Sequence, residues 1–236
     1  YNDGKLSDFE YWDKVASIRE DYRAKVKLAF SGDEVNVTKA HVNEVFASFL
    51  EKIEKGIEKA IKLGNGIVPT YLTHEAVDFE PVTDANGEPV ISHYGLQKAK
   101  VKEFKTIPLP YFLEGPARMM GYMDADDARK LFNAVKETDI YDKKLAMYKT
   151  SASIEKCSME NGRCRAFTPG WQERENVFLH MEYKYILAMI KAGLYDEYYD
   201  TITRALIPFL DPNMYGRSIL ENSSFIASSA NPNEDI

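Results

Sequence analysis

The sequence has little cysteine and no long apolar run. No stretch approaches the roughly 20 apolar residues that a membrane-spanning helix needs, and the first residues lack the basic-then-apolar pattern of a signal peptide. Only Cys157 and Cys164 are present, without the CxxC spacing or the histidine pair of a zinc site. We therefore expect a cytoplasmic protein with reduced thiols and without a metal or an organic cofactor. A disulfide across the short loop between the cysteines is the alternative.

Positive charge is neither abundant nor clustered. The chain has 30 Lys and Arg against 37 Asp and Glu, a formal net charge of -7, and its basic residues are interspersed with acidic ones. Binding to a phosphate backbone needs concentrated positive charge, so this distribution disfavours nucleic acid as a partner. Hydrophobic residues make up 44% of the 236 residues, enough to bury one core, and we expect residues 1–236 to form one domain.

Two helices are predicted in the first quarter of the chain. Apolar residues recur at helical spacing from Val15 to Phe30, where Ser31-Gly32 supplies a stop. A second apolar stripe runs from Val42 to Ile61. Thr38 is placed to cap this second helix, and Gly64-Asn65-Gly66 is placed to end it.

The segment from Ile67 to Lys105 has a different character. Short β-branched and aromatic stretches surround a turn-rich sequence in which Asn86-Gly87 favours positive φ, so a β-hairpin is predicted. A polar stretch from Tyr141 to Gly170 is too long for a simple connection and is interpreted as an active-site loop. Further helices are predicted at 116–122, after the cap Asp124, and at 177–190, 195–206 and 219–230.

These elements predict a mainly α fold built from antiparallel helical hairpins, with the β-hairpin as an excursion near residues 67–105. Helix pairs of varied length suit a ring of helical hairpins better than a simple bundle. The pairs in this chain are too few to close such a ring. We therefore expect the chain to be a segment of a larger catalytic module and to be inactive by itself.

The densest cluster of chemically active side chains runs from Phe167 to His180. A Pro-Gly turn is followed by carboxylates and an aromatic residue, and then by an apolar helix that begins near Val177. His180 lies near the start of this helix, and two roles are open for it. It is either a buried structural residue that donates to a backbone carbonyl or a ligand in a pocket.

The pattern formed by Pro169, Gly170, Glu173, Phe178 and His180 resembles the motif of the cellobiose-phosphorylase family, glycoside hydrolase family 94. Most of the chain is similar to large cellobiose-phosphorylase-like proteins, above all the segments 66–71, 108–116, 179–185 and 211–225. The resemblance implies a catalytic (α/α)6 toroid of which this chain is the C-terminal part. It also implies that His180 is a phosphate ligand and that Glu173 is a carboxylate in the pocket.

The same resemblance suggests a catalytic acid. The family has its general acid, an aspartate, in a Trp-Asn-Asp segment, and Tyr1-Asn2-Asp3-Gly4 is similar, with Tyr in place of Trp. Asp3 would then protonate the leaving oxygen while inorganic phosphate attacks the anomeric carbon of a β-linked oligosaccharide. Because phosphate is already an anionic nucleophile, no second carboxylate is needed to activate water. An ordinary Asn-Asp-Gly turn is the alternative.

Other residues are candidate substrate ligands. Tyr71 and Trp171 are placed to stack on sugar rings, although packing in the core or at its rim is a frequent role of aromatic residues. Arg217 is expected to reach the same end of the toroid as His180. Three arginines around the long loop are candidates for attracting phosphate, or else are solvated surface charges: Arg163, Arg165 and Arg174.

Two departures separate the chain from the characterised phosphorylases. They have Glu-Asn-Gly-Gly where this chain has Glu173-Arg-Glu-Asn176, and their Gly-rich, Thr-containing phosphate loop has no counterpart up to Ile236. A glycoside hydrolase on the same toroid, and a helical carbohydrate-binding module without catalysis, therefore stay as alternatives. The expected partners are an oligosaccharide, inorganic phosphate and a second copy in a homodimer, as in many relatives.

Overall fold

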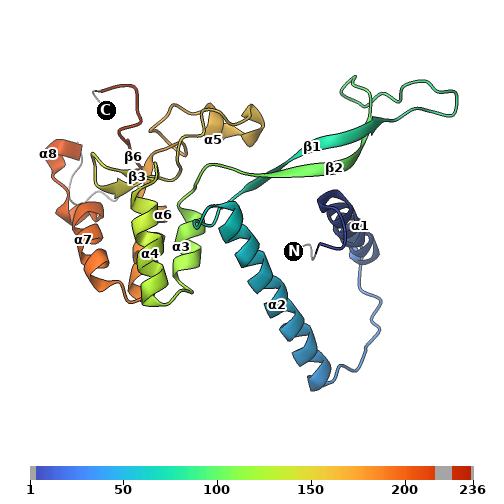
Figure 1. The fold of residues 1–236 in the computed structure, drawn as a ribbon, viewed down its shortest axis with the longest axis horizontal. Helices are drawn as coiled ribbons and strands as arrows, with labels where there is room; N and C mark the ends of the chain where they lie inside the picture. Colours follow the sequence, from blue (N-terminus) through green and yellow to red (C-terminus); the bar gives the residue numbers. More distant parts are fainter. Residues whose placement is uncertain (1–3, 216–224, 235–236) are drawn as a thin grey trace. The chain divides into compact units, whose positions relative to one another are not determined.

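The computed structural model describes residues 4–215 and 225–234. The chain divides into two compact units, Tyr1–Ile57 with Thr73–Ile107 (unit 1) and Glu58–Leu72 with Pro108–Ile236 (unit 2), whose elements are labelled in Figure 1. The described chain is mainly helical with small pairs of strands, as predicted. That residues 1–236 form one domain stays a prediction, because two compact units can belong to the same domain.

Helix α1 of unit 1, Asp8–Val26, starts at a capping box. Ser7 Oγ accepts from Glu10 N at 3.1 Å, and the Glu10 carboxylate accepts from Ser7 N at 2.9 Å. The predicted boundaries, 15–30, are therefore wrong at both ends. The start of the helix is set by the cap at Ser7, and the missed first turns include Phe9 and Trp12.

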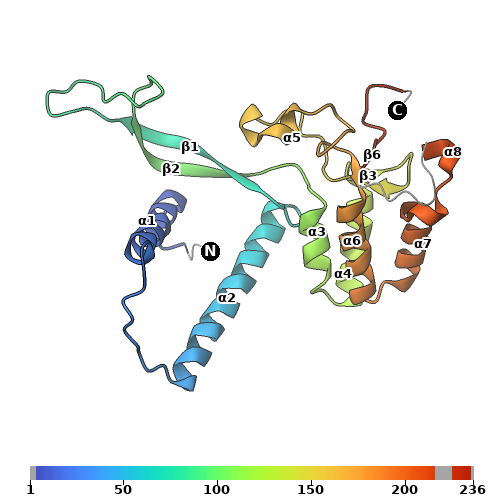
Figure 2. The same ribbon diagram turned by 180° about the vertical axis from the view of Figure 1, so that it is seen from behind.

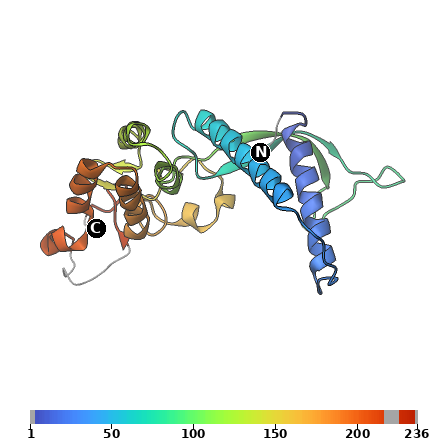
Figure 3. The same cartoon turned by 90° about the horizontal axis from the view of Figure 1, so that it is seen from below.

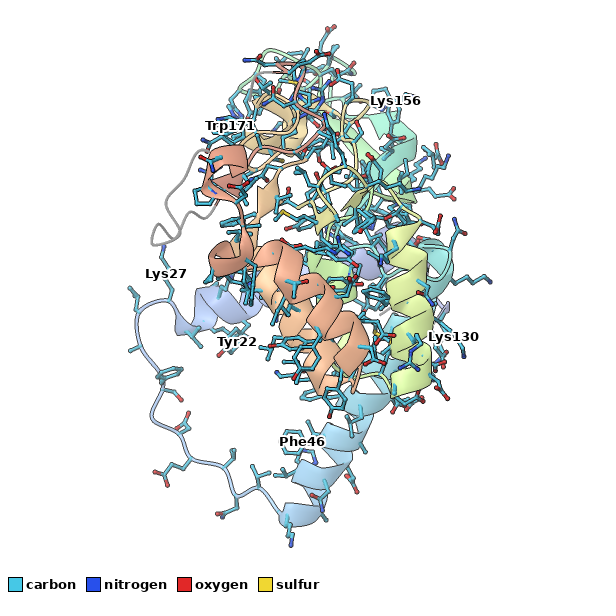
Figure 4. The ribbon with its side chains drawn as sticks, turned by 90° about the vertical axis from the view of Figure 1, so that its left-hand side faces the viewer. Tyr22, Lys27, Phe46, Lys130, Lys156 and Trp171 are labelled. Atoms are coloured by element: carbon cyan, nitrogen blue, oxygen red, sulfur yellow. The ribbon has the colours of Figure 1, made fainter. Side chains whose placement is uncertain are left out.

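Helix α2, Lys39–Leu63, matches its prediction. His41 N donates to Thr38 Oγ1 at 3.1 Å, which satisfies an amide of the first turn, and Gly66 takes a φ of 95° just beyond the end of the helix. No residue of α2 is buried, and Phe46 is 59% exposed (Figure 4). The predicted apolar face therefore exists and is exposed over much of its length, whereas Val45, Ile57, Ala60 and Ile61 are partly buried.

The predicted β-hairpin is formed by β1, Leu72–Pro81, and β2, Ala99–Pro108. Its turn is organised by Asp84, whose carboxylate accepts from two backbone N–H groups, and Gly87 takes the expected positive φ, 84°. The ring of Phe104 on β2 contacts two aromatic rings of α1, with centroid distances of 5.3 and 5.8 Å. These aromatic contacts anchor α1 to the hairpin.

Four helices of unit 2 lie side by side: α3 (Glu114–Met120), α4 (Ala125–Lys136), α6 (Leu179–Lys191) and α7 (Tyr195–Ala205) (Figure 2). Helix α6 contacts both α3 and α7, and Figure 3 views the group close to end-on. Asp124 caps α4 through Asp127 N. The helix predicted after Asp124 buries four apolar residues: Ala128, Leu131, Phe132 and Val135.

The stretch from Tyr141 to Gly170 is more ordered than the irregular loop that was predicted. It contains an antiparallel strand pair, a 3-10 turn and a short helix: β3 (Tyr141–Asp142), β4 (Met147–Tyr148), η1 (Met159–Asn161) and α5 (Arg163–Ala166). Figure 1 shows these short elements at one end of α4 and α6. Met147 and Tyr148 are buried, so part of the core of unit 2 comes from a stretch whose composition is polar.

The end of the described chain differs from the prediction. After η2 (Ile207–Phe209) and α8 (Pro212–Tyr215), strand β6 (Phe225–Ile226) pairs antiparallel with β5 (Val177–Phe178). The last predicted helix, 219–230, is therefore wrong over its described part. The helix predicted at 177–190 begins two residues later than expected, at Leu179, because residues 177 and 178 form β5. Strands of two residues are too short for any sequence periodicity to mark them.

Candidate functional site

The segment from Thr168 to Asn176, which we call the site loop, leads directly into β5 and α6. Trp171 N donates to Thr168 O at 3.2 Å in its opening turn. Gln172 and Glu175 take positive φ values, 58° and 56°, a region that residues other than glycine occupy rarely. Such conformations cost about 1–3 kcal/mol, persist only where the surroundings enforce them, and cluster at functional sites.

Glu173, the predicted pocket carboxylate, is partly exposed and is paired with an arginine. Its side chain is 39% exposed, and Arg163 donates to both of its oxygens, from Nε to Oε2 at 2.9 Å and from Nη2 to Oε1 at 2.7 Å. Two parallel bonds of this kind fix the plane of the carboxylate. Arg163 lies on α5, in a segment from Glu155 to Phe167 that we call the clamp segment.

Arg174, the next residue of the site loop, is buried and is bound by the clamp segment. Its Nη1 donates to Arg165 O and Phe167 O, both at 2.9 Å, and its Nη2 donates to the Glu155 carboxylate. The hydrogen bond from Arg174 and the charge of Arg165 lower the pKa of Glu155. The three arginines considered for phosphate are thus each paired with a carboxylate of this chain.

Glu175 and Asn176 form a buried polar cluster that local sequence patterns do not predict. Glu175 Oε2 lies 3.5 Å from Arg174 Nε, and neither atom has a hydrogen-bond partner among the described residues. Glu175 N donates to Ser151 Oγ at 3.4 Å, and Thr150 Oγ1 donates to Asn176 Oδ1 at 3.1 Å. A run of polar residues in a sequence does not distinguish such buried groups from solvated ones, so only the fold identifies them.

The segment from Phe225 to Asn231 lies against the site loop. Ser228 N donates to Gly170 O at 3.0 Å, and Ser228 Oγ donates to Glu175 O. Gly170 has a φ of 72°, and a Cβ built on it would lie 2.3 Å from Asn231 N, so this close approach requires glycine. The Pro-Gly turn therefore serves the packing of a distant segment as well as the start of the site loop.

His180 lies in the first turn of α6 and is exposed. The alternative of a buried structural histidine is therefore wrong. Its ring lies 5.6 Å from that of Phe178, which stacks on Phe225 at 4.4 Å. Among the described residues, the N-cap Phe178 supplies no side-chain cap to α6, and the amides of a helix N-terminus attract anions. The position therefore combines an accessible imidazole with a partial positive charge.

Trp171 and Tyr71, the predicted stacking residues, are both accessible. Trp171 is partly exposed in the site loop (Figure 4), and Tyr71 is 49% exposed, with its ring edge-on to that of Phe112 at 5.0 Å. Phe112 pairs with Ser151 in an isolated β-bridge, and Ser151 accepts from Glu175 N. Tyr71 is thus connected to the site loop through Phe112 and Ser151.

Two further predicted residues, the candidate acid Asp3 and the candidate ligand Arg217, lie outside the described residues. Trp171, Glu173 and His180 belong to one continuous segment of unit 2, which runs from the site loop into α6. This segment is the candidate functional site.

Glu182 is a second acidic residue that was missed. It is 0% exposed, and its Oε1 accepts from Tyr148 N at 2.9 Å. Glu182 Oε2 and the hydroxyls of Tyr148 and Tyr185 have no hydrogen-bond partner in the described parts of the chain. Burial raises the pKa of Glu182 to about 8, although the hydrogen bond from Tyr148 lowers it in part. Glu182 lies three residues after the buried Leu179 and seven before the buried Met189. This helical spacing places it on the buried face of α6 and is the signal by which the sequence could have identified it.

A groove of about 370 Å³ lies between α3 and α6. Ala117, Gly121 and Leu187 contribute apolar walls, and Lys184 and Lys191 lie among the residues that line it. None of the predicted site residues that the structure describes lines this groove, which is therefore a separate surface feature of unit 2.

No family model, curated protein or solved structure matches this chain. In the part that the structure describes, no three or more His, Cys, Asp or Glu side chains gather as a metal site, and Cys157 and Cys164 are free thiols. None of the described helices has the length and apolar character that crossing a membrane requires.

Proposed function

We propose that this chain forms part of a carbohydrate-active enzyme that cleaves β-glycosidic bonds by inverting phosphorolysis, on the (α/α)6 toroid of glycoside hydrolase family 94. The support comes from the sequence likeness around the site loop, taken together with the conformation of that loop. The chain then contributes antiparallel helix pairs to the ring, and an oligosaccharide and inorganic phosphate bind where the site loop meets α6.

The backbone at Glu175 carries the proposal. The characterised phosphorylases have Glu-Asn-Gly-Gly where this chain has Glu173-Arg-Glu-Asn176, so their first glycine falls on Glu175. Glu175 takes a φ of 56°, in the left-handed region that glycine occupies without strain. The agreement between the glycine of the motif and the observed φ supports a shared loop conformation.

The side chains around the site loop suit a sugar and an anion. Glu173 is 39% exposed, so sugar hydroxyls can reach its carboxylate, and Trp171 offers a flat apolar face for a sugar ring. The exposed His180 and the uncapped first turn of α6 supply hydrogen-bond donors for phosphate.

Phosphorolysis needs few catalytic side chains. A phosphate oxygen attacks the anomeric carbon from the face opposite the leaving sugar, so that the configuration at this carbon inverts. A carboxylic acid, which we assign to Asp3, transfers its proton to the departing oxygen as the glycosidic bond breaks. His180 offsets part of the phosphate charge and holds the anion in line. The products are an α-sugar 1-phosphate and the shortened sugar.

The substitution Asp3→Asn in the full-length protein tests this assignment, and Asp13→Asn, which changes an exposed carboxylate of α1, is its matched control. Cleavage of cellobiose in phosphate buffer is expected to fall by about 100-fold or more for Asp3→Asn and to stay unchanged for Asp13→Asn. Cellobiose affinity, measured by calorimetry, should persist in both variants. An Asp3→Asn protein as fast as wild type would contradict the assignment.

A glycoside hydrolase on the same toroid would need a second carboxylate to activate water. Glu175 adds a carboxylate where the phosphorylases have glycine, but it is only 4% exposed and lies beside Arg174. That burial removes Glu175 as the base, so Glu173, which is 39% exposed, would take that role in a hydrolase. A binding module without catalysis would bind cellobiose and release no product in any buffer.

A further inference from the structure

The clamp segment holds the site loop through three arginines. Arg163 binds the Glu173 carboxylate, and Arg174 reaches from the site loop to the Glu155 carboxylate and to two carbonyls. Arg165 stabilises the clamp segment internally, because its Nε donates to Cys157 O at 3.1 Å. The conformation of the site loop therefore depends on the clamp segment.

Arg163 differs from the other two arginines in its exposure. Its side chain is 75% exposed, against 17% for Arg165 and 4% for Arg174. Single exposed ion pairs add little to the stability of a fold, whereas a bidentate arginine–carboxylate pair holds both side chains in one geometry. Arg163 therefore fixes the orientation of the Glu173 carboxylate while it stays at the surface.

The geometry at Glu173 leaves room for a ligand. Each carboxylate oxygen carries two lone pairs, and Arg163 uses one on each oxygen. One lone pair on each oxygen remains for a second donor. Two adjacent hydroxyl groups on a ring match two oxygens held in one plane, and Trp171, on the same loop, offers a face for the ring itself.

We infer that Arg163 is a positioning residue, which binds both oxygens of Glu173 and so holds this carboxylate ready for the adjacent hydroxyl groups of a sugar ring. The identity of the ligand as a sugar rests on the proposed function. Arg163 itself need not touch the sugar, because its effect passes through Glu173.

Three variants of the full-length protein test the inference. Arg163→Ala removes the pair. Arg118→Ala is the matched control, because Arg118 also binds a glutamate, Glu114, and is 73% exposed. The double variant Arg163→Glu, Glu173→Arg exchanges the two partners. Hydrogen exchange with mass spectrometry reports the amides of residues 168–176, and calorimetry reports the Kd for cellobiose.

Arg163→Ala is expected to accelerate exchange in residues 168–176 and to raise the Kd for cellobiose by about tenfold, because the freed Glu173 side chain must be ordered on binding. Arg118→Ala is expected to change neither quantity. The double variant should restore slow hydrogen exchange of the site-loop amides. It should not restore the affinity for cellobiose, because its carboxylate lies on the clamp segment and no longer on the site loop. A purely structural pair would restore both.

Unchanged exchange and Kd in Arg163→Ala would overturn the inference, and so would recovery of cellobiose binding in the double variant. If the wild-type protein does not bind cellobiose, the proposed substrate class is wrong. In that case the hydrogen-exchange rates alone test whether Arg163 holds the site loop. If Arg163→Ala exchanges no faster in residues 168–176 than Arg118→Ala, that role is wrong.

Discussion

Glu182 makes the stability of unit 2 depend on pH through one side chain. It is 0% exposed, and burial raises its pKa from an ordinary 4.5 to about 8. Between these pH values the folded protein keeps a proton that the unfolded chain has lost. The free energy of unfolding contributed by this group therefore falls as the pH rises from about 4.5 to about 8. Because Glu182 has no exposure, this proton is not available to a substrate.

Glu182→Gln removes the ionisable group and keeps an oxygen that accepts from Tyr148 N. We expect the variant to unfold at a higher temperature than wild type near pH 8, by several degrees, and to lose most of the advantage near pH 5. Thermal unfolding followed by circular dichroism at both pH values measures this. Glu160→Gln, at an exposed position, is the control. Parallel pH curves for Glu182→Gln and wild type would show that the carboxyl is not protonated in the fold.

His180 is the residue whose environment bears most on phosphate. It is exposed and lies in the uncapped first turn of α6. Replacing it by Ala, which has no donor, is expected to raise the KM for phosphate by roughly 10- to 100-fold, the worth of a hydrogen bond to a charged group. The KM for cellobiose should change little. Steady-state kinetics with each substrate varied in turn separates the two, and His93→Ala, in the hairpin, is the control. Equal increases in both KM values would argue for a general loss of structure instead.

Among the elements, the site loop depends on a distant part of the chain. Gly170 is left-handed, with a φ of 72°, and has Asn231 N within 2.3 Å of its Cβ position. Gly193 has a similar φ, 80°, but its nearest neighbour would lie at 4.0 Å. Substituting alanine at Gly193 therefore measures the cost of the backbone conformation alone. The same substitution at Gly170 adds the cost of the steric clash.

Gly193→Ala is expected to lower the free energy of unfolding by about 1 kcal/mol, and Gly170→Ala by roughly 2 kcal/mol or more, because only the second adds steric overlap. Urea denaturation of each variant of the purified protein gives both values. Equal losses would mean that the segment 225–231 does not lie against the site loop.

The elements that the sequence predicts well are those whose signals are local. The helix at 39–63 has a capping Thr38, a continuous apolar stripe and a terminal Gly64-Asn65-Gly66, and the structure reproduces all three. The pairing of β5 with β6 joins residues far apart in the chain, and no local pattern marks it. The predicted helix 219–230 failed there because Phe225 and Ile226 also fit a helical stripe.

The same distinction holds for the candidate site. Glu173, Trp171 and His180 were predicted from one contiguous motif, and their partial or full exposure suits ligands. The groups that hold the surrounding loop, such as Ser228 at Gly170 and Glu175, belong to other segments. Sequence periodicity reports which face of an element is apolar, and it does not report which distant polar groups meet. The sequence therefore did not identify Glu175 as a buried residue.

For the whole molecule, the central claim is that phosphate replaces water as the nucleophile. The most direct measurement is the product of cellobiose cleavage by the full-length protein, followed by proton and phosphorus NMR, with and without inorganic phosphate. We predict equal amounts of glucose and α-glucose 1-phosphate when phosphate is present and no cleavage when it is absent. Release of glucose alone, at the same rate in both conditions, would contradict the claim.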